Sequence, residues 1–520
     1  MVLDPINAQR QRAFHRRSRF GCRTCRARHV KCDETPGACV KCTSTGRTCE
    51  GYDIFPPRAV VTKVATPSQN LTLPGTSSGQ RRWFHFFRNR TMPMLIGYYD
   101  SELWQQIVLQ VSQGEPAVFH AVVALGVLQQ DTEASRNRRG LKRSMSRDRY
   151  FALEQYSRSI SILSQRLSSN DPLVREIALV CCLIFTLFEF VQDNYATALS
   201  HLESGLRILA RQNGSEARSS ISAGLYEHKA NYCTMEDALA RAFSRLDVQA
   251  AHFDSSSNTS LLPADINIAD ITYDRLDLRS IQDAKEKLDP IINNVFRFRT
   301  TCDTTLRDEL GDHATLYVQH ARMRANMKDH IMAFQRLISR SPPQTTRNIR
   351  SVDLILQHHL VIMVVLDTVL SLSEMVYDQY IPQMEKAVNI SERIIDSMKA
   401  EYGPELPTIL LDMGVILCLS WISLKCRDVG VRIRALNLLR VWPHREGPNV
   451  STAFLCSCRE AVEMEVDAAD PVTGFIPELS RVRFISTQKS KDSHHAVLLY
   501  AMSDPEKKQL DVLQREFVIE

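Results

Sequence analysis

Six closely spaced cysteines near the start of the chain constrain its fold more than any other feature. They lie in the stretch CRTCRARHVKCDETPGACVKCTSTGRTC, which places six of the 14 cysteines within 28 residues. The intervals between successive cysteines are 2, 6, 6, 2 and 6 residues, so two CxxC pairs are each followed by a third cysteine. The six are Cys22, Cys25, Cys32, Cys39, Cys42 and Cys49. A segment this short cannot build a hydrophobic core, so its stability must come from what the thiols bind.

This spacing favours metal binding over disulfides. The N-terminus, MVLDPINAQRQRAFHRRSRF, has cations but no apolar run after them, so it lacks the pattern of a secretory signal. We therefore expect the thiols to lie in a reducing compartment, where dense cysteines indicate a metal site. A CxxC turn places two sulfurs on one tetrahedral ion, and thiolates favour Zn²⁺.

The number of cysteines predicts two zinc ions that share ligands. Two separate four-coordinate ions would need more ligands than the six cysteines supply, and His29 is the only histidine within the segment. If sulfur alone coordinates both ions, two thiolates must bridge them. Cys22 and Cys39, the first cysteine of each half, are the natural bridging pair. Because a structural zinc supplies on the order of 10 kcal/mol of folding free energy, we expect this segment to be unfolded without metal.

The complete pattern resembles the binuclear zinc cluster domain of fungal transcription factors. The features that match are the spacing CxxCx6Cx6CxxCx6C, the basic residues after the second cysteine, and the Cys-Asp-Glu sequence that begins at Cys32. The resemblance implies that the first four cysteines hold one zinc, and that the first, fourth, fifth and sixth hold the other. In this chain the two sets are Cys22, Cys25, Cys32 and Cys39, and Cys22, Cys39, Cys42 and Cys49.

Positive charge is concentrated around the cysteines. Residues 1–52 hold eleven Lys or Arg and four acids, for a net +7, whereas the remainder holds 53 basic and 55 acidic residues, for a net −2. A local excess of this kind predicts a polyanion partner, and nucleic acid is the usual one. The stretch RARHVK between the second and third cysteines contains no acid. We therefore expect the first half of the cluster to meet double-stranded DNA.

The resemblance also implies roles for individual residues of this stretch. In the family, the short helix after the second cysteine enters the major groove and reads a CGG-type triplet. On that basis Arg28 and His29 face bases, while Arg26 and Lys31 contact the phosphate backbone. Arginine suits a bidentate contact with guanine, but His29 replaces the Lys or Arg of many members, which leaves the triplet preference open.

The sequence divides into four regions. Residues 1–20 form a basic arm that serves as phosphate contacts, as a nuclear import signal or as a solvated tail. The zinc cluster domain covers residues 21–52, and a linker covers residues 53–82, where DIFPPRAVVTKVATPSQNLTLPGTSSGQ is rich in Pro, Ser, Thr and Gly. The coiled coil that often follows such a linker is not predicted here, so monomer and homodimer both stay open. Residues 83–520 form the body.

Helical periodicity predicts a mainly α chain whose body is an all-α stack of antiparallel helices. A nearly all-apolar helix from Asp171 to Phe190 should lie at its centre. The stripe of Leu103, Ile107 and Val111 should follow a cap at Asp100 or Ser101. RVRFI at 481 and AVLLY at 496 are weak strand signals. Further helices are expected near 153–167, 199–209, 235–252, 316–340, 349–372, 380–401, 408–426 and 451–467.

The stretches EPAVFHAVVALGVL, CCLIFTLFEFVQDNYATALSHLESGLRIL and WPHREGP are similar to the helical regulatory domain of fungal factors. This resemblance implies partner contacts, ligand sensing or autoinhibition rather than catalysis. The paired cysteines of the body, and its paired histidines, are expected to be packing or surface residues rather than a second metal site. We find no motif typical of an enzyme, and the longest uncharged apolar stretches are shorter than the ~20 residues of a membrane helix.

Together these features predict a nuclear, sequence-specific DNA-binding transcription factor of the RNA polymerase II type. Its cofactor would be two Zn²⁺ ions, and its partners would be DNA, a second copy of the chain, and the transcription machinery or co-regulators, with no membrane. The main alternative is a zinc-stapled protein-interaction module, and a remoter one is an enzyme. The basic RARHVK stretch favours DNA. Target genes, the direction of regulation and any small-molecule effector are not specified by the sequence.

Overall fold

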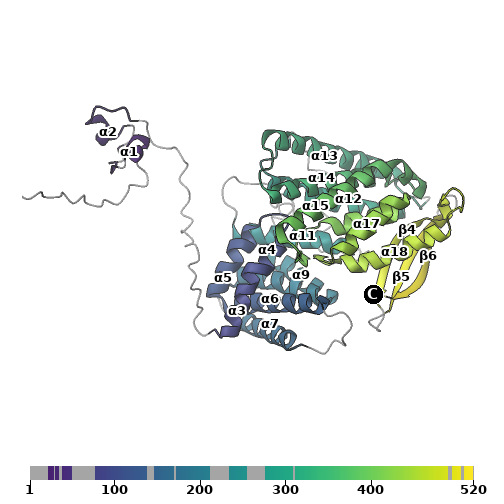
Figure 1. The fold of residues 1–520 in the computed structure, drawn as a ribbon, viewed down its shortest axis with the longest axis horizontal. Coiled ribbons are helices and arrows are strands. Elements are labelled where there is room, and N and C mark those ends of the chain that lie inside the picture. The colour runs from purple at the N-terminus through teal and green to yellow at the C-terminus, as the bar shows by residue number, and fades with distance from the viewer. Residues whose placement is uncertain are drawn as a thin grey trace, which may run out of the picture. The chain divides into compact units, whose positions relative to one another are not determined.

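The structure, a computed structural model, divides the chain into two compact units, Met1–Thr72 and Leu73–Glu520 (Figure 1). The first unit contains two short described helices, α1 (Arg23–Ala27) and α2 (Val40–Thr43). The expected arm and most of the expected linker lie outside the described residues. The structure describes residues 22–28, 30–33, 35, 38–49, 76–137, 146–168, 171, 173–210, 234–253, 276–308, 311–489, 495–504 and 509–518.

The second unit begins with helices packed around α8 (Val174–Val191). Every residue of α8 from Ile177 to Phe190 is buried, which confirms the predicted central helix. Its first turn starts three residues after Asp171, whose carboxylate accepts a hydrogen bond from the N–H of Leu173 at 2.9 Å. The other elements of this first layer are α3 (Ser78–Phe86), the π-helical η1 (Phe87–Thr91), α4 (Met92–Leu95), the π-helical η2 (Leu103–Ile107), α5 (Val108–Gly114), α6 (Pro116–Asn137), α7 (Arg147–Arg166), α9 (Tyr195–Ala210) and α11 (Met235–Phe253).

A second layer of helices has its own hydrophobic core, which draws mainly on residues 276–442. The long helices α12 (Ile281–Thr305), α13 (His313–Arg340), α14 (Thr346–Thr368) and α15 (Ile381–Tyr402) form most of it (Figure 1). Polar caps begin three of them, since Ser280, Asp312 and Thr345 each accept a hydrogen bond from a backbone N–H of the first turn. The remaining helices are the 3₁₀-helical η4 (Glu374–Tyr380) and η5 (Glu478–Ser480), α16 (Val415–Lys425), α17 (Val429–Val441) and α18 (Ser451–Asp467).

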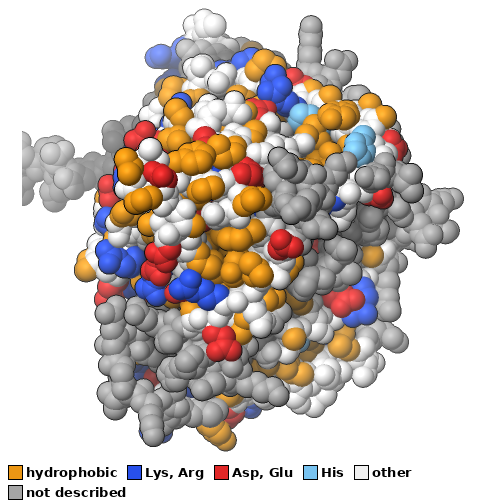
Figure 2. All heavy atoms as spheres, turned by 90° about the vertical axis from the view of Figure 1, so that its right-hand side faces the viewer, with side chains coloured by type: hydrophobic (Ala, Val, Ile, Leu, Met, Phe, Trp, Pro, Cys, Tyr) orange, Lys and Arg blue, Asp and Glu red, His pale blue; other side chains and the backbone are white. Residues whose placement is uncertain are grey.

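The described C-terminal residues form an antiparallel sheet. Its strands are β4 (Val482–Lys489), β5 (His495–Asp504) and β6 (Gln509–Val518), in the order β4-β5-β6. Cys456 of α18 packs against Leu498 and Phe517 of this sheet. Figure 2 views the side on which α18 and this sheet lie in Figure 1, and apolar side chains lie there among charged ones. The weak strand signals RVRFI and AVLLY are confirmed as parts of β4 and β5, and the sheet adds a β element to a body that was otherwise expected to be all-α.

A second, smaller sheet lies at the boundary between the two helical cores. Ile409 belongs to the first core, and the next residue, Leu410, belongs to the second. They form β1 (Ile409–Leu410), which pairs in parallel with β2 (Arg445–Glu446). β2 in turn pairs antiparallel with β3 (Asn449–Val450). The chain thus crosses from one core to the other within this sheet.

A single buried carboxylate, that of Glu446, connects several elements at this boundary. It accepts hydrogen bonds from the backbone N–H groups of residues 414–416 at 2.8 to 3.1 Å, and these are the free donors at the start of α16. The hydroxyl of Tyr98 donates to it at 3.0 Å, and His444 Nε2 also lies 3.0 Å away. Burial, together with the charge of Glu446, raises the pKa of Tyr98, so the phenol remains a donor.

Residues of the WPHREGP motif make several of the contacts at this boundary. The indole of Trp442 donates a hydrogen bond to the carbonyl of Pro407 at 2.8 Å, which holds the end of α17 against the segment before β1. Arg445 forms an ion pair with Asp193, in the turn after α8. Gly447 has a φ of 54°, in the left-handed region that glycine favours, and turns the chain between β2 and β3. The motif therefore joins the layers rather than forming a separate site.

The mainly helical fold class is confirmed, and the differences from the sequence prediction are local. The helix begins at Glu102, so Ser101 stands at the predicted capping position, where its backbone carbonyl accepts a hydrogen bond from the N–H of Gln105 at 2.9 Å, and the helix continues as the π-helical η2. The segment expected as helix over 408–426 begins instead with strand β1. The helix α12 was not expected, and it contains Pro290 in its interior. The helix α3 begins at Ser78, within the expected linker.

One described helix, α14, is long and apolar enough to cross a membrane by length and composition alone. However, 72% of its apolar window is buried inside the body. Its burial against the other helices is that of a core helix of a globular protein.

Replacing Glu446 with glutamine should destabilise the body. The amide would place a donor against the N–H groups of residues 414–416 and remove the negative charge that caps α16. We expect the free energy of unfolding to fall by about 2 kcal/mol or more, measured as a lower thermal midpoint. Glu463→Gln, on the exposed face of α18, is the control and should change it by less than about 0.5 kcal/mol. Equal midpoints for the two variants would contradict this role.

The buried histidines of the second core should make the body less stable in mild acid. Burial lowers the pKa of His358 to about 4, and it also lowers the pKa of His330 and His359. Unfolding returns these side chains to an ordinary pKa of 6.5, so the unfolded chain binds more protons between pH 6.5 and about 4. Stability should therefore fall as the pH falls through that window.

His358→Leu should flatten this pH dependence, since it removes one group that takes up a proton on unfolding. We expect the slope to decrease by on the order of 1 kcal/mol per pH unit. The measurement is the urea midpoint at about pH 7 and about pH 5, with the exposed His85→Leu as control. If the two variants show the same pH dependence, other groups cause the acid sensitivity.

Candidate metal centre and nucleic-acid interface

The structure brings the sulfurs of all six N-terminal cysteines together in the first unit. They form two groups of four, and within each group the ligand atoms lie within 4.8 Å of one another. Cys22 and Cys39 belong to both groups, so the arrangement has the shared pair that the ligand count requires. None of the described cysteines forms a disulfide. The groups are Cys22, Cys25, Cys32 and Cys39, and Cys22, Cys39, Cys42 and Cys49.

The separations between sulfurs fit tetrahedral zinc. Cys39 Sγ lies 3.6 Å from the Sγ of Cys22 and 3.6 Å from that of Cys25. A Zn–S bond of about 2.3 Å places neighbouring sulfurs of a tetrahedron about 3.8 Å apart. The spacing of the sulfurs is therefore that of ligands that share one metal ion. It is much too long for a disulfide bond of about 2.05 Å.

Two short helices and their backbone N–H groups position the sulfurs. Cys25 lies on α1 and Cys42 on α2, and Cys39 is the residue that precedes α2. The N–H of Cys25 donates to Cys22 Sγ at 3.3 Å, and the N–H of Cys39 donates to Cys49 Sγ at 3.5 Å. Such N–H groups stabilise negative charge on a thiolate, as metal coordination requires.

Because these thiols are buried, they lose their protons only when a cation binds. Cys22, Cys25 and Cys39 are completely buried, and burial raises the pKa of all three. Without a cation the thiols therefore hold their protons. A metal ion has to displace these protons, so metal affinity should fall as the pH falls.

Asp33 connects the two halves of the cluster, and its role was not foreseen from the sequence. Its carboxylate accepts hydrogen bonds from the hydroxyl of Thr35 and from the N–H groups of Val40 and Lys41 at 3.0 and 3.1 Å. The bond from Thr35, followed by those from the backbone, lowers the pKa of Asp33. The Cys-Asp-Glu sequence was the available signal, but a cap seven residues before its helix becomes visible only when the loop is folded.

The residues predicted to contact DNA are partly described. Lys31 is exposed, and Arg28 is half-buried, with its Nη1 donating to Thr45 Oγ1 at 3.4 Å. In this contact the guanidinium of Arg28 points towards the second half of the cluster. The side chain of Arg26 and the whole of His29 lie outside the described residues.

Comparisons with known families account for both parts of the chain. The family model of the fungal Zn(2)-Cys(6) binuclear cluster domain matches residues 20–59. That of the fungal specific transcription factor domain matches residues 82–359, which is more than half of the chain. The chain belongs to the fungal zinc cluster transcription factors. The resemblance seen in the sequence is thereby confirmed, and with it a zinc-binding domain at the N-terminus.

Curated members of this family are similar over parts of the chain. The transcription regulator lscL of Purpureocillium lilacinum is 32% identical over 200 residues, which are 35% of this chain and 47% of that protein. The aspercryptin biosynthesis cluster-specific transcription regulator atnN of Emericella nidulans is 28% identical over 277 residues, 46% of this chain and 41% of that protein. The transcriptional regulatory protein moc3 of Schizosaccharomyces pombe is 60% identical over 37 residues, 7% of each chain.

The matched part of this zinc cluster factor spans less than half the length of these curated relatives. No solved structure matches this chain.

Proposed function

We propose that the chain is a nuclear, sequence-specific DNA-binding regulator of genes transcribed by RNA polymerase II. The observation that carries this proposal is the pair of four-sulfur groups that share Cys22 and Cys39, with the basic stretch from Arg26 to Lys31 lying between the second and third cysteines. The relatives are named as transcription regulators, which supports the same function.

In this proposal each group of four sulfurs holds one Zn²⁺, so the chain binds two ions. Cys22 and Cys39 bridge them. Cys25 and Cys32 complete the first site, and Cys42 and Cys49 complete the second. The six thiolates leave the cluster with a net negative charge, which the surrounding cations stabilise, and the ions hold together a segment that has no hydrophobic core of its own.

The basic stretch reads DNA in the major groove. Arg28 and His29 approach base edges of a CGG-like triplet, while Arg26 and Lys31 contact phosphates. Arg28 exchanges its long bond to Thr45 for guanine O6 and N7, which a guanidinium can contact in a bidentate manner. Lys31 is exposed and supplies charge without base selectivity.

The helical body regulates this reader. We propose that it contacts the transcription machinery or co-regulators, and that it catalyses no reaction. Homodimer formation and nuclear localisation stay predictions. The zinc-stapled protein-interaction module remains the competing function, and a selection on random DNA separates the two.

Single cysteine replacements should show which thiolates bridge. Cys22→Ser and Cys39→Ser should each disrupt both metal sites, because each removes a ligand from both ions. Cys49→Ser should leave the first site largely occupied, because Cys49 belongs to the second group alone. Zinc per chain, measured by elemental analysis of the purified full chain, checks this. Equal zinc loss in all three variants would contradict the bridging assignment.

Two basic residues should affect DNA binding in different ways. Arg28→Ala should relax sequence preference by about 1 to 3 kcal/mol for the lost base contact. Lys31→Ala should weaken binding to all sequences alike and reduce the salt dependence by about one unit. Arg47→Ala, in the second half of the cluster, is the matched control and should alter neither quantity.

The measurement is selection of the full chain on a randomised duplex library, followed by affinity titrations on the enriched and on random DNA at several salt concentrations. An enriched CGG-like triplet supports the DNA-reading function. If Arg28→Ala and Lys31→Ala act identically on both duplexes, the base-reading role is wrong. Full zinc occupancy without any enriched sequence would favour the protein-interaction module.

A further inference from the structure

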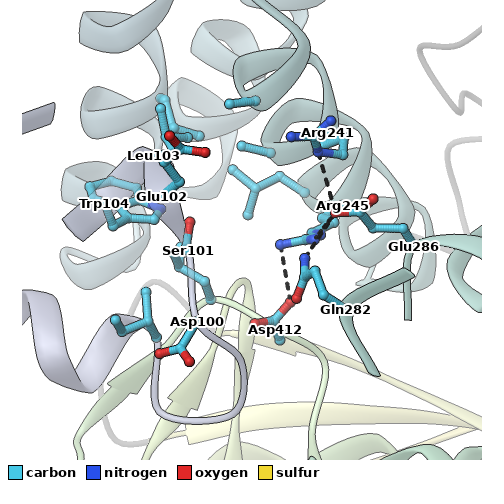
Figure 3. Close-up of a pocket in the computed structure, with 16 residues that line it drawn as sticks. Asp100, Ser101, Glu102, Leu103, Trp104, Arg241, Arg245, Gln282, Glu286 and Asp412 are labelled. Atoms are coloured by element: carbon cyan, nitrogen blue, oxygen red, sulfur yellow. Dashed lines mark hydrogen bonds and ion pairs between the residues drawn. The ribbon is translucent and has the colours of Figure 1, made fainter. Parts of the chain in front are cut away.

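A small cavity lies in the body where the two helical layers meet. Its volume is about 190 Å³. Figure 3 shows residues 100–104 on one side of it, and side chains of α11 and α12 on the other, with Asp412 between them. Pockets that bind drug-sized ligands are roughly 300 to 1,000 Å³, so this cavity fits only a small organic molecule.

One part of the cavity wall is apolar. Leu103, Trp104, Leu183 and Leu246 are all buried and line it together. Water bound against such a surface finds few hydrogen-bond partners. This part therefore suits a hydrocarbon group rather than a charged one.

The polar part of the wall contains a guanidinium with unused donors. The side chain of Arg245 is 19% exposed and lies 3.5 Å from Glu286, 3.8 Å from Asp289 and 3.8 Å from Asp412. Hydrogen bonds from arginine to a carboxylate are about 2.7 to 2.9 Å long, so these contacts are loose. Within the described part of the chain Arg245 makes no hydrogen bond. Burial opposes its charge, but the neighbouring carboxylates, Asp412 first, raise the pKa of Arg245, so it remains a cation.

Beside this donor lies an unused acceptor. The side chain of Asp412 is 5% exposed, and its Oδ1 has no hydrogen-bond partner among the described residues. The cations around it, Arg245 Nη1 and Lys285 Nζ, lie 3.8 and 3.7 Å from this oxygen. An unsatisfied buried carboxylate oxygen is costly, and in native structures such an atom indicates a missing partner.

The charges of the lining residues select among small ligands. Two arginines and four acids line the cavity. The four acids would repel a ligand that carries only a negative charge, and the two arginines would repel a ligand that carries only a positive charge. A molecule that carries both charges on neighbouring atoms satisfies the donor and the acceptor together. The acids are Asp100, Glu102, Glu286 and Asp412, and the arginines are Arg241 and Arg245.

We propose that this cavity binds an α-amino acid with an apolar side chain. Its carboxylate lies on Arg245, its ammonium group lies on Asp412 Oδ1, and its side chain packs against Leu103 and Trp104. The site goes beyond the DNA-reading function, because it gives the helical body a small-molecule ligand of its own.

The test is calorimetric titration of the purified full chain with L-leucine. Two analogues of the same shape serve as probes, 4-methylpentanoate, which lacks the ammonium group, and 3-methylbutylamine, which lacks the carboxylate. We expect L-leucine to bind, and each analogue to bind at least about tenfold more weakly, because each leaves one buried charge unpaired. Equal binding of 4-methylpentanoate would overturn the role of Asp412. If neither L-leucine nor L-phenylalanine binds, the cavity holds water alone and the proposal is wrong.

Variants locate the binding. Arg245→Gln and Asp412→Asn should each weaken L-leucine binding at least about tenfold. Ala242→Leu fills part of the cavity without changing a charge, so it should abolish binding while the thermal midpoint stays the same or rises. Arg434→Gln, which alters an exposed ion pair with Glu392 elsewhere, is the control and should leave binding unchanged. Binding that survives Ala242→Leu would place the ligand elsewhere and overturn the proposal. The assay involves neither DNA nor zinc, so its failure leaves the DNA-reading function untouched.

Discussion

The body depends on the buried carboxylate of Glu446. This group satisfies the donors at the start of α16, and it also binds Tyr98 from the segment after α4 and His444, the third residue of the WPHREGP motif. Tyr98 and residues 414–416 are far from Glu446 in the sequence, so these contacts form only when the chain folds, whereas His444 lies two residues away. Burying a carboxylate is costly unless it accepts hydrogen bonds, and Glu446 accepts several. These bonds also satisfy donors that would otherwise be buried without a partner. Tyr98 and the start of α16, which belong to the second core, are thereby fixed to the WPHREGP segment.

The same boundary brings the proposed ligand site into contact with the frame of the body. Asp412, which supplies the unused acceptor of the cavity, lies two residues before Gly414, whose N–H donates to Glu446. β1 ends at Leu410, directly before this segment. An amino acid bound at Asp412 would therefore contact the same short segment that joins the two layers. The ligand and the contacts between the layers would then involve the same backbone segment. A ligand can change the body only if it interacts with a part that differs between two states, and this segment could be such a part.

The two units obtain their stability from different sources. The body buries two large apolar cores. Among the described residues of the zinc cluster region, the buried core consists of cysteines, with Cys49 partly exposed beside them. Its sulfurs are already grouped, and the Asp33 cap adds a bond between the halves, but an apolar contribution of this size cannot hold a fold. Metal is therefore a structural component of the zinc cluster unit, whereas apolar cores stabilise the described part of the body.

The sequence by itself determined the cluster and the helical class of the body, because these depend on local information. Cysteine spacing sets which sulfurs can share an ion, and a nearly all-apolar helix such as α8 has to be buried wherever it lies. Tertiary structure alone decided the roles of Asp33, Glu446 and Asp412. Each of these acids interacts with groups that are distant in the chain or lie on another element, and no periodic pattern marks them. The strand β6 and the helix α12 were missed for a related reason, since long-range pairing and packing override the local preferences of their residues.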